Sequence, residues 1–193
     1  MKKRELDTYS GPFDPQWKYE NLSKEALIRL LNEFGRAFIA IDGFWFTLVE
    51  NKFGIDTAME LDTAIWSKYI PPWTTPRFRK ALDIQGNNVE TLFKLMQNLP
   101  DATADLYEYT FDLKNPNHGI WTCIHCPGLS FFERKQRPER IIPVCHELEP
   151  ASMRGYAALI NPDMVVTPLK LPPRKSPDEI CCQWEFKLEP KKK

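Results

Sequence analysis

Cysteine, histidine and acidic residues gather in three short segments of the second half of the chain. All five cysteines and two of the three histidines lie in the segments 121–127, 145–150 and 181–186. Thiolate, imidazole and carboxylate groups are the ligands that Zn²⁺ prefers, and a thiolate is also a nucleophile. These residue types therefore indicate metal binding or thiol chemistry, with packing of the thiols in an apolar core as the third interpretation.

The alternation of strand residues separates four of the cysteines by face. Cys123 and Cys126 have the spacing of a zinc knuckle, but alternation along their strand places them on opposite faces. In the last apolar stretch, residues 180–189, alternation directs Cys182 toward the core and Cys181 toward a wetter surface. Cys126 and Cys182 are therefore the candidates for a shared site.

The fifth cysteine precedes a predicted helix. Proline is tolerated only in the first turn of a helix, so Pro150 places the start of a helix that runs to about residue 160 at residues 147–149. Cys145 then lies just before the helix, and Glu149 follows it by four residues. Glu149 is the acid that we expect beside the thiols.

Three interpretations of this set remain open. A zinc site would be built from Cys126, Cys145, Cys182 and Glu149, with a neighbouring histidine available as a further ligand. A catalytic site would use Cys145, Glu149 and Cys182, with Cys145 as the best-placed nucleophile because it lies at a helix start. Under the third interpretation the thiols only pack, since free cysteine is among the most buried residue types. Zn²⁺ is the candidate cofactor under the first interpretation.

The composition narrows the kinds of partner. Lysine plus arginine and aspartate plus glutamate both number 26, and basic residues cluster only at the two ends, which argues against a nucleic-acid-binding face. No apolar run reaches the ~20 residues of a membrane span, and no signal peptide is visible at the start. We therefore expect a cytoplasmic protein with a small-molecule ligand, and neither a nucleic acid nor a membrane as partner. The sequence does not predict the oligomeric state.

Helices are predicted for the first half of the chain. Ser23 is the expected N-cap of a long helix that ends near Gly54, because apolar residues recur in steps of three and four between them. A second helix is expected over residues 56–69, with Ala58, Leu61, Ile65 and Tyr69 pointing inward, and the two prolines at 71–72 are expected to stop it. Two shorter helices are expected at residues 76–84, with Pro76 as the first helical residue, and at residues 88–98.

Two acids interrupt the apolar stripes of the first two predicted helices. Asp42 lies at the shoulder of the first stripe, and Asp62 lies within the second. One interpretation is a buried acid that serves a pocket. The other is a hydrogen bond to a neighbouring tryptophan or tyrosine, or exposure at the edge of the stripe. We favour the second interpretation, because stripe edges tolerate acids whose carboxylates reach water.

The period of the apolar residues changes to two after residue 100. Residues 107–113 and 119–126 alternate on either side of a turn, which predicts a β-hairpin. Residues 164–171 are a predicted strand at an edge of the sheet because they contain Pro168. Residues 180–189 are the last predicted strand.

The predicted fold class is α+β, with an N-terminal helical bundle followed by a small, mostly antiparallel sheet and a packed helix. Four parts are expected along the chain. They are an irregular segment at 1–22, a helical subdomain at 23–100, an α+β cysteine-containing subdomain at 101–189 and a basic tail at 190–193.

Four short motifs resemble an uncharacterised prokaryotic family of unknown function. They are Ile-Asp-Gly-Phe-Trp at 41–45, Leu-Asp-x-x-x-Trp at 61–66, Cys-His-Glu-Leu-Glu-Pro at 145–150 and Cys-Cys-Gln-Trp-Glu-Phe at 181–186. The resemblance covers most of residues 20–189.

The C-terminal half is also distantly similar to the L-2-amino-thiazoline-4-carboxylic acid hydrolase-like family. Cys145 with Glu149 matches one element of that family, and Cys182 with Phe186 matches another. Gln183 stands where the family has an acid. The resemblance implies opening of a small cyclic C–N bond, with cysteine and acid near the site.

Two functions are therefore predicted. The first is a small-molecule-handling protein that acts as a hydrolase on a small cyclic C–N substrate. The alternative is a non-catalytic, sensory domain that binds a metal or an apolar ligand. Its cavity would be walled by aromatic residues, namely Phe44, Trp45, Trp66, Trp121 and Trp184.

Overall fold

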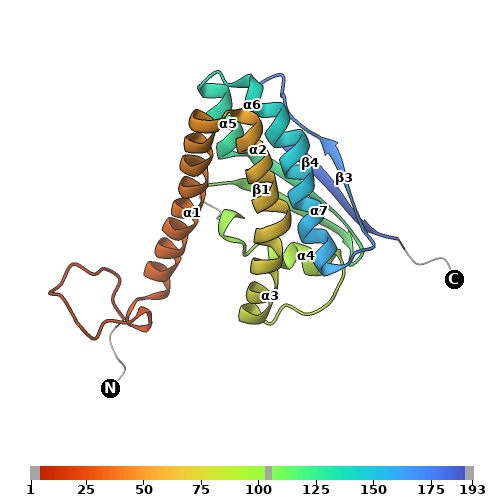
Figure 1. Cartoon of the computed structure of the whole chain (residues 1–193). Helices are drawn as coiled ribbons and strands as arrows, with labels where there is room; N and C mark the ends of the chain where they lie inside the picture. Colours follow the sequence, from red (N-terminus) through yellow and green to blue (C-terminus); the bar gives the residue numbers. More distant parts are fainter. Residues whose placement is uncertain (1–4, 103–105, 190–193) are drawn as a thin grey trace.

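Helices fill the first half of the chain, and an antiparallel sheet follows in the second half (Figure 1). The structure is a computed structural model that describes residues 5–102 and 106–189. The helices lie on one face of the sheet, so the α+β fold class is confirmed. The predicted basic tail at 190–193 lies outside the described residues. The division into subdomains stays a prediction.

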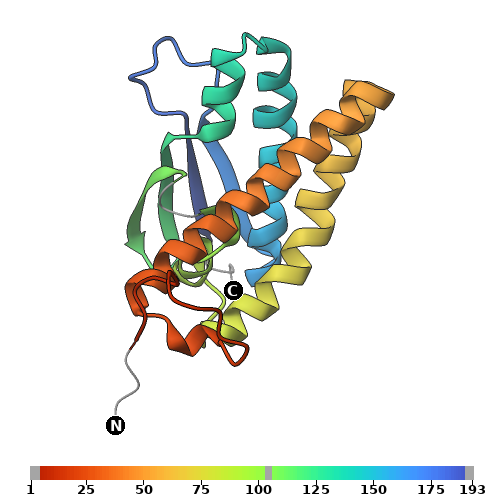
Figure 2. The ribbon, with the colours of Figure 1, turned by 90° about the vertical axis from the view of Figure 1, so that its left-hand side faces the viewer.

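The first long helix has the predicted ends. In α1 (Lys24–Phe53) the hydroxyl of the N-cap Ser23 accepts a hydrogen bond from the backbone N–H of Ala26 at 3.1 Å. Gly54 ends the helix at φ 89°, a conformation that glycine adopts without strain. Figure 2 shows α1 crossing in front of the sheet. No helix within the described residues combines the length and apolar character needed to cross a bilayer.

The prediction that the prolines at 71–72 stop a helix is wrong. The helical path continues through α2 (Ile55–Ala64), a π turn (Ile65–Tyr69) and α3 (Ile70–Leu82). Ile70 donates its backbone N–H to the carbonyl of Ile65, five residues back, so the bonding register moves by one residue just before Pro71. Because proline has no N–H to donate, this is where the helix tolerates it. Pro76 likewise lies inside α3 and does not begin a helix.

The predicted inner face of this helix is also partly wrong. Leu61 and Tyr69 were expected to point inward, but they are 42% and 68% exposed. Ala58 is buried as predicted, and Met59, Asp62 and Trp66 are the other buried side chains. Asp62, rather than Leu61, therefore lies on the buried face of this helix.

A second helical path passes through a π turn in the same way. It consists of α6 (Pro138–Ile142), a π turn (Pro143–Leu148) and α7 (Glu149–Ile160). Glu149 donates its N–H to the carbonyl of Val144, again five residues back and again just before a proline, Pro150. Cys145 therefore lies inside the helical path, and the prediction that it precedes the helix is wrong.

Gly155 allows the two helical paths to touch. A Cβ atom at this position of α7 would lie 2.7 Å from the carbonyl oxygen of Ser67, in the first π turn, and 3.4 Å from Cγ of Pro71. Such a short distance to a backbone atom forces one of the two helices to move.

We expect Gly155→Ala to lower the free energy of unfolding by about 1–3 kcal/mol, the usual cost of overpacking. Gly43→Ala is the matched control, because a Cβ at this helical glycine meets nothing within 4 Å. It should stabilise by roughly 0.5–1 kcal/mol through helix propensity. Urea unfolding of both variants measures the difference, and equal effects would contradict the close approach.

The sheet has the strand order β1-β2-β4-β3, with all pairs antiparallel. The predicted hairpin and edge strand are confirmed. The strands are β1 (Glu108–Asn115), β2 (His118–His125), β3 (Met164–Lys170) and β4 (Cys182–Leu188). In the register of β2 and β4, Cys123 lies opposite Cys182.

The main core lies between the sheet, α7 and α4 (Val89–Met96). Asn88 caps α4 by accepting a hydrogen bond from the N–H of Thr91 at 3.0 Å. The ring of Phe93 packs on Phe111 at 4.8 Å and on Phe186 at 5.5 Å between centroids. This core fixes the sheet against the helices on one side of the cavity described next.

Candidate functional site

A large cavity lies between α1, the two π turns and the inner face of the sheet. Its volume is about 870 Å³, and most of its wall is apolar. Four of the five predicted wall aromatics line it, and Trp45 does not. These four are Phe44, Trp66, Trp121 and Trp184. The size and lining are those of a site for a small organic molecule.

Both π turns contribute to the wall. Trp66 comes from the first turn, and Val144, Cys145 and Leu148 come from the second. Isolated π turns within α-helices are rare and occur frequently at functional sites. Their presence on two sides of one cavity supports a functional role for the cavity.

Four acidic side chains from four elements line the same cavity. They are Asp42 of α1, Asp62 of α2, Asp101 of the short turn Pro100–Ala102 and Glu149 of α7, here called the acid pole. Trp66 donates its Nε1–H to Oδ1 of Asp42 at 3.0 Å. Both interpretations therefore apply to Asp42, because it accepts a hydrogen bond from a tryptophan and it also lines a pocket. Asp62 is only 4% exposed, and its Oδ1 atom has no hydrogen-bond partner.

Burial and mutual repulsion keep the acid pole partly protonated. Burial, followed by the charges of Asp42 and Glu149, raises the pKa of Asp62 to about 8. Burial and the carboxyls of Asp101 and Asp42 raise the pKa of Glu149 to about 7. Burial raises the pKa of Asp101 to about 6, and it also raises the pKa of Asp42. Such values are typical of functional sites.

Arg140 is the single basic side chain among the described residues of the cavity wall. It is already paired, because its guanidinium contacts both carboxylate oxygens of Glu50. Arg137 donates to the same carboxylate at 2.8 Å. The acid pole therefore has no free counter-charge from the described part of the wall.

All five cysteines line the cavity and belong to one apolar cluster around Leu129 and Ile141. The prediction that Cys181 faces a wetter surface is wrong, since Cys181 and Cys123 are each 1% exposed. The strand period fails here because Cys181 lies in the bend before β4. Cys126 likewise follows the end of β2 and caps α5 (Pro127–Arg134) with its sulfur, at 3.4 Å from the N–H of Leu129.

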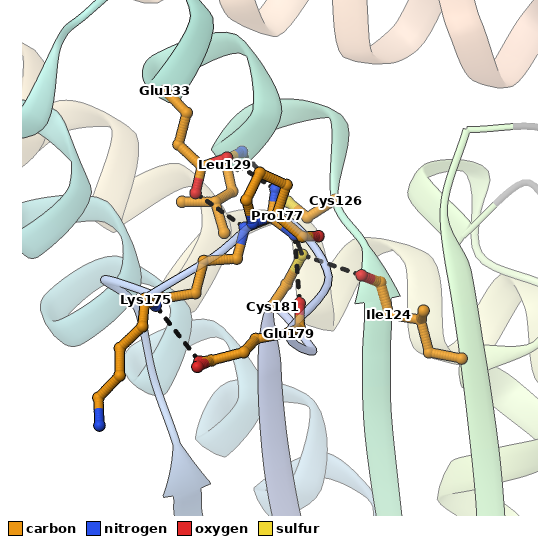
Figure 3. Close-up of polar contacts among 9 residues, drawn as sticks. Ile124, Cys126, Leu129, Glu133, Lys175, Pro177, Glu179 and Cys181 are labelled. Atoms are coloured by element: carbon orange, nitrogen blue, oxygen red, sulfur yellow. Dashed lines mark hydrogen bonds and ion pairs between the residues drawn. The ribbon is translucent and has the colours of Figure 1, made fainter.

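The thiols differ in their surroundings. The Cys181 Sγ lies 3.2 Å from the carbonyl oxygen of Ile124 (Figure 3). It also lies 3.7 Å from Nη1 of Arg174. Hydrogen bonding with the Cys123 thiol, followed by the charge of Arg174, lowers the pKa of Cys181 to about 7. Burial and the Glu149 carboxyl raise the pKa of the Cys145 thiol well above its usual range.

The four predicted site residues all lie in the wall of this cavity. They are Cys126, Cys145, Glu149 and Cys182. Within residues 5–102 and 106–189, however, no three or more histidine, cysteine or acidic side chains are arranged to hold a metal ion. The two neighbouring histidines are exposed, and one of them, His146, donates its Nε2–H to the carbonyl of Pro172 at 2.6 Å. The predicted zinc site thus gains no support.

Asp101 is a site residue that sequence reasoning missed. Nothing in its local sequence marks it, because it follows a proline in a short turn rather than a patterned helix or strand. For Asp42 and Asp62 a signal existed, namely an acid within an apolar stripe. The adjacent Trp66 on the same stripe would have strengthened it, since a buried indole N–H needs an acceptor.

The sequence model of a family of unknown function (DUF6125) matches residues 20–188. The chain belongs to this family. The part of the chain that DUF6125 covers runs from before α1 to the end of β4, so it contains the whole acid pole and all five cysteines. No curated protein and no solved structure matches the chain. DUF6125 membership therefore identifies the family without assigning a reaction.

Proposed function

We propose that this protein binds a small, largely apolar organic molecule in the cavity between α1 and the sheet. The observation that carries the proposal is an apolar cavity of about 870 Å³ with the buried, unpartnered carboxyl oxygen of Asp62 in its wall. Ligand sites combine an apolar lining with a few polar groups that fix the orientation of the ligand. A buried polar atom without a partner is rare, and a ligand atom would supply the missing partner.

Two exposed alanines of α1 allow a matched test. Ala40 lines the cavity, whereas Ala37, three residues earlier on the same helix, does not. Ala40→Trp places a large side chain in the cavity, and Ala37→Trp adds the same side chain outside it. We expect the neutral fluorescent probe N-phenyl-1-naphthylamine to bind the natural chain and Ala37→Trp alike, and to bind Ala40→Trp about tenfold more weakly or worse. Equal binding to both variants, or no binding at all, would reject the proposal.

Hydrolysis of a C–N bond is the second candidate function, and Glu149 is the observation that favours it. A carboxyl with a pKa of about 7 can both accept and donate a proton near neutral pH. Its carboxylate would take a proton from water as the hydroxyl adds to the C=N or C=O carbon, and would return that proton to the nitrogen as the C–N bond breaks. This route needs no thiolate, which fits the raised pKa of Cys145. The same reaction class is the one implied by the resemblance of Cys145 with Glu149 to an element of the thiazoline-carboxylate hydrolase-like family, a resemblance drawn from the sequence alone.

A screen of small cyclic amidines and amides tests this second function. We expect any turnover to be lost in Glu149→Gln. Turnover that survives the double variant Cys145→Ala/Cys182→Ala would exclude these thiols as nucleophiles. Turnover that also survives Glu149→Gln would reject the hydrolytic assignment of this cavity, while binding of the probe would still stand.

A further inference from the structure

The charge of the cavity wall is unbalanced. The described wall carries the four carboxyl groups of the acid pole and one guanidinium, Arg140, which Glu50 already neutralises. Carboxyl groups crowded in an apolar wall resist ionisation, and a positive charge placed among them favours their ionised form. The wall is therefore complementary to a cation.

Three buried polar atoms of this wall also lack a hydrogen-bond partner, namely Oδ1 of Asp62, Oδ1 of Asp101 and Nε1 of Trp184. Asp62 and Trp184 are only 4% and 1% exposed. Trp184 lies on β4 and is not one of the acids, so it is a separate sign that polar ligand atoms belong in the cavity. Its indole N–H is a donor and would pair with an acceptor atom on the body of the ligand, while the carboxyls receive the charged nitrogen. Unsatisfied buried groups cost free energy that a ligand can recover.

The geometry points to an organic cation rather than a metal ion. Within the described ranges, the acids do not form a group with the close spacing of metal ligands. An apolar wall of aromatic side chains favours a carbon skeleton attached to the charged group.

We propose that the acid pole binds the basic nitrogen of an amine or amidine that has an apolar body, and that binding releases protons from the pole. This proposal rests on the proposed binding function and names its ligand class. The nitrogen would donate to Asp62 and to the carboxyls around it, and charge-assisted hydrogen bonds of this kind are short and strong.

The direction of the pH effect follows from the groups that face one another. Asp62 faces Asp42, Glu149 and the indole of Trp66, and Glu149 in turn faces Asp101, the Cys145 thiol and the Tyr107 hydroxyl. The cation stabilises ionised carboxylates, so protons that the empty pole holds at pH 7 leave on binding. An amine with an ordinary pKa of about 10 stays charged throughout, so its affinity should rise between pH 6 and pH 8.

Three probes of the same shape test the proposal by isothermal titration calorimetry. They are 4-phenylbutylamine, the neutral 4-phenylbutan-1-ol and the anionic 4-phenylbutyrate. We expect the amine to bind about ten- to a hundredfold more tightly than the alcohol, the usual range for a hydrogen bond to a charged group. Titration at pH 7 in phosphate and in Tris should give different heats, because these buffers take up protons with different enthalpies.

Two variants complete the test. Asp62→Asn should remove most of the preference for the amine over the alcohol, and it should also reduce the proton release. Glu60→Gln removes one charge from the exposed side of the same helix and should change the amine affinity by less than about twofold.

Each outcome separates the cation proposal from the binding function. If the alcohol or the butyrate binds as tightly as the amine, the cation proposal fails and the cavity remains a binding site. Tight amine binding without proton release would also overturn the cation proposal. If no probe binds and N-phenyl-1-naphthylamine does not bind either, the proposed function itself fails.

Discussion

Asp62→Asn is expected to make the protein more stable, by about 3 kcal/mol more at pH 8 than at pH 5. Burial raises the pKa of Asp62 from 3.8 to about 8, so the folded state holds a proton that the unfolded chain loses above pH 4. Stability from this group is therefore present at low pH and is lost as pH rises from about 4 through about 8. Asparagine resembles the protonated side chain and carries no charge to desolvate, so the variant escapes this loss.

Chemical unfolding of both proteins between pH 5 and pH 8 measures the effect. The natural chain should lose stability across this window, and the curve of the variant should be flatter. A gain in stability from the loss of one carboxyl would fit a residue kept for binding, because functional sites often cost stability. Parallel curves for the two proteins would contradict the buried position of Asp62.

Glu50→Ala is expected to lower the free energy of unfolding by about 3–5 kcal/mol, the usual cost of breaking a buried ion pair. Its carboxylate holds the guanidinium of Arg140, whose side chain is only 5% exposed and lies over the ring of Phe46 at 5.0 Å. Removing Glu50 leaves that positive charge buried without a counter-charge. The more exposed Arg137 loses its bond as well.

Two comparison variants identify the cause of this loss. Glu33→Ala breaks an exposed ion pair with Arg36 in the same helix and should cost less than about 1 kcal/mol. The double variant Glu50→Ala/Arg140→Met removes both charges and should recover part of the stability, because an apolar side chain needs no counter-charge. No recovery in the double variant would show that Glu50 acts through packing rather than charge.

The ends of the elements were predictable where the signal is local. The serine cap and the glycine stop identified α1, and the two alternating runs around a turn identified the hairpin. Each of these signals depends on residues close together in the chain. The two π turns were not predictable in this way. A proline inside an apolar pattern normally ends a helix. At Pro71 and Pro150 a hydrogen bond that spans five residues comes just before the proline and makes it compatible with the helical path.

The site was predictable only in part for a related reason. Cys145 and Glu149 are four residues apart, so one short segment of the sequence indicated both. The acid pole, by contrast, combines residues from α1, α2, a short turn and α7, so no local pattern could bring it together. The thiols of Cys126 and Cys181 lie just outside the strands, where the alternation that we applied to them no longer holds.

The prolines after the two π turns hold the extra residue of each turn at a fixed place in the helical path. A π turn contains one residue more than the α-helical turn it replaces, and each added residue rotates the following helix by about 100°. In a uniform helix such an extra residue can shift along the axis, because every neighbouring N–H offers an alternative partner. Pro71 and Pro150 offer none, so each extra residue is held at one place, directly beside the cavity. The prolines thus preserve the rotation that aims Trp66 and Cys145 into the ligand space.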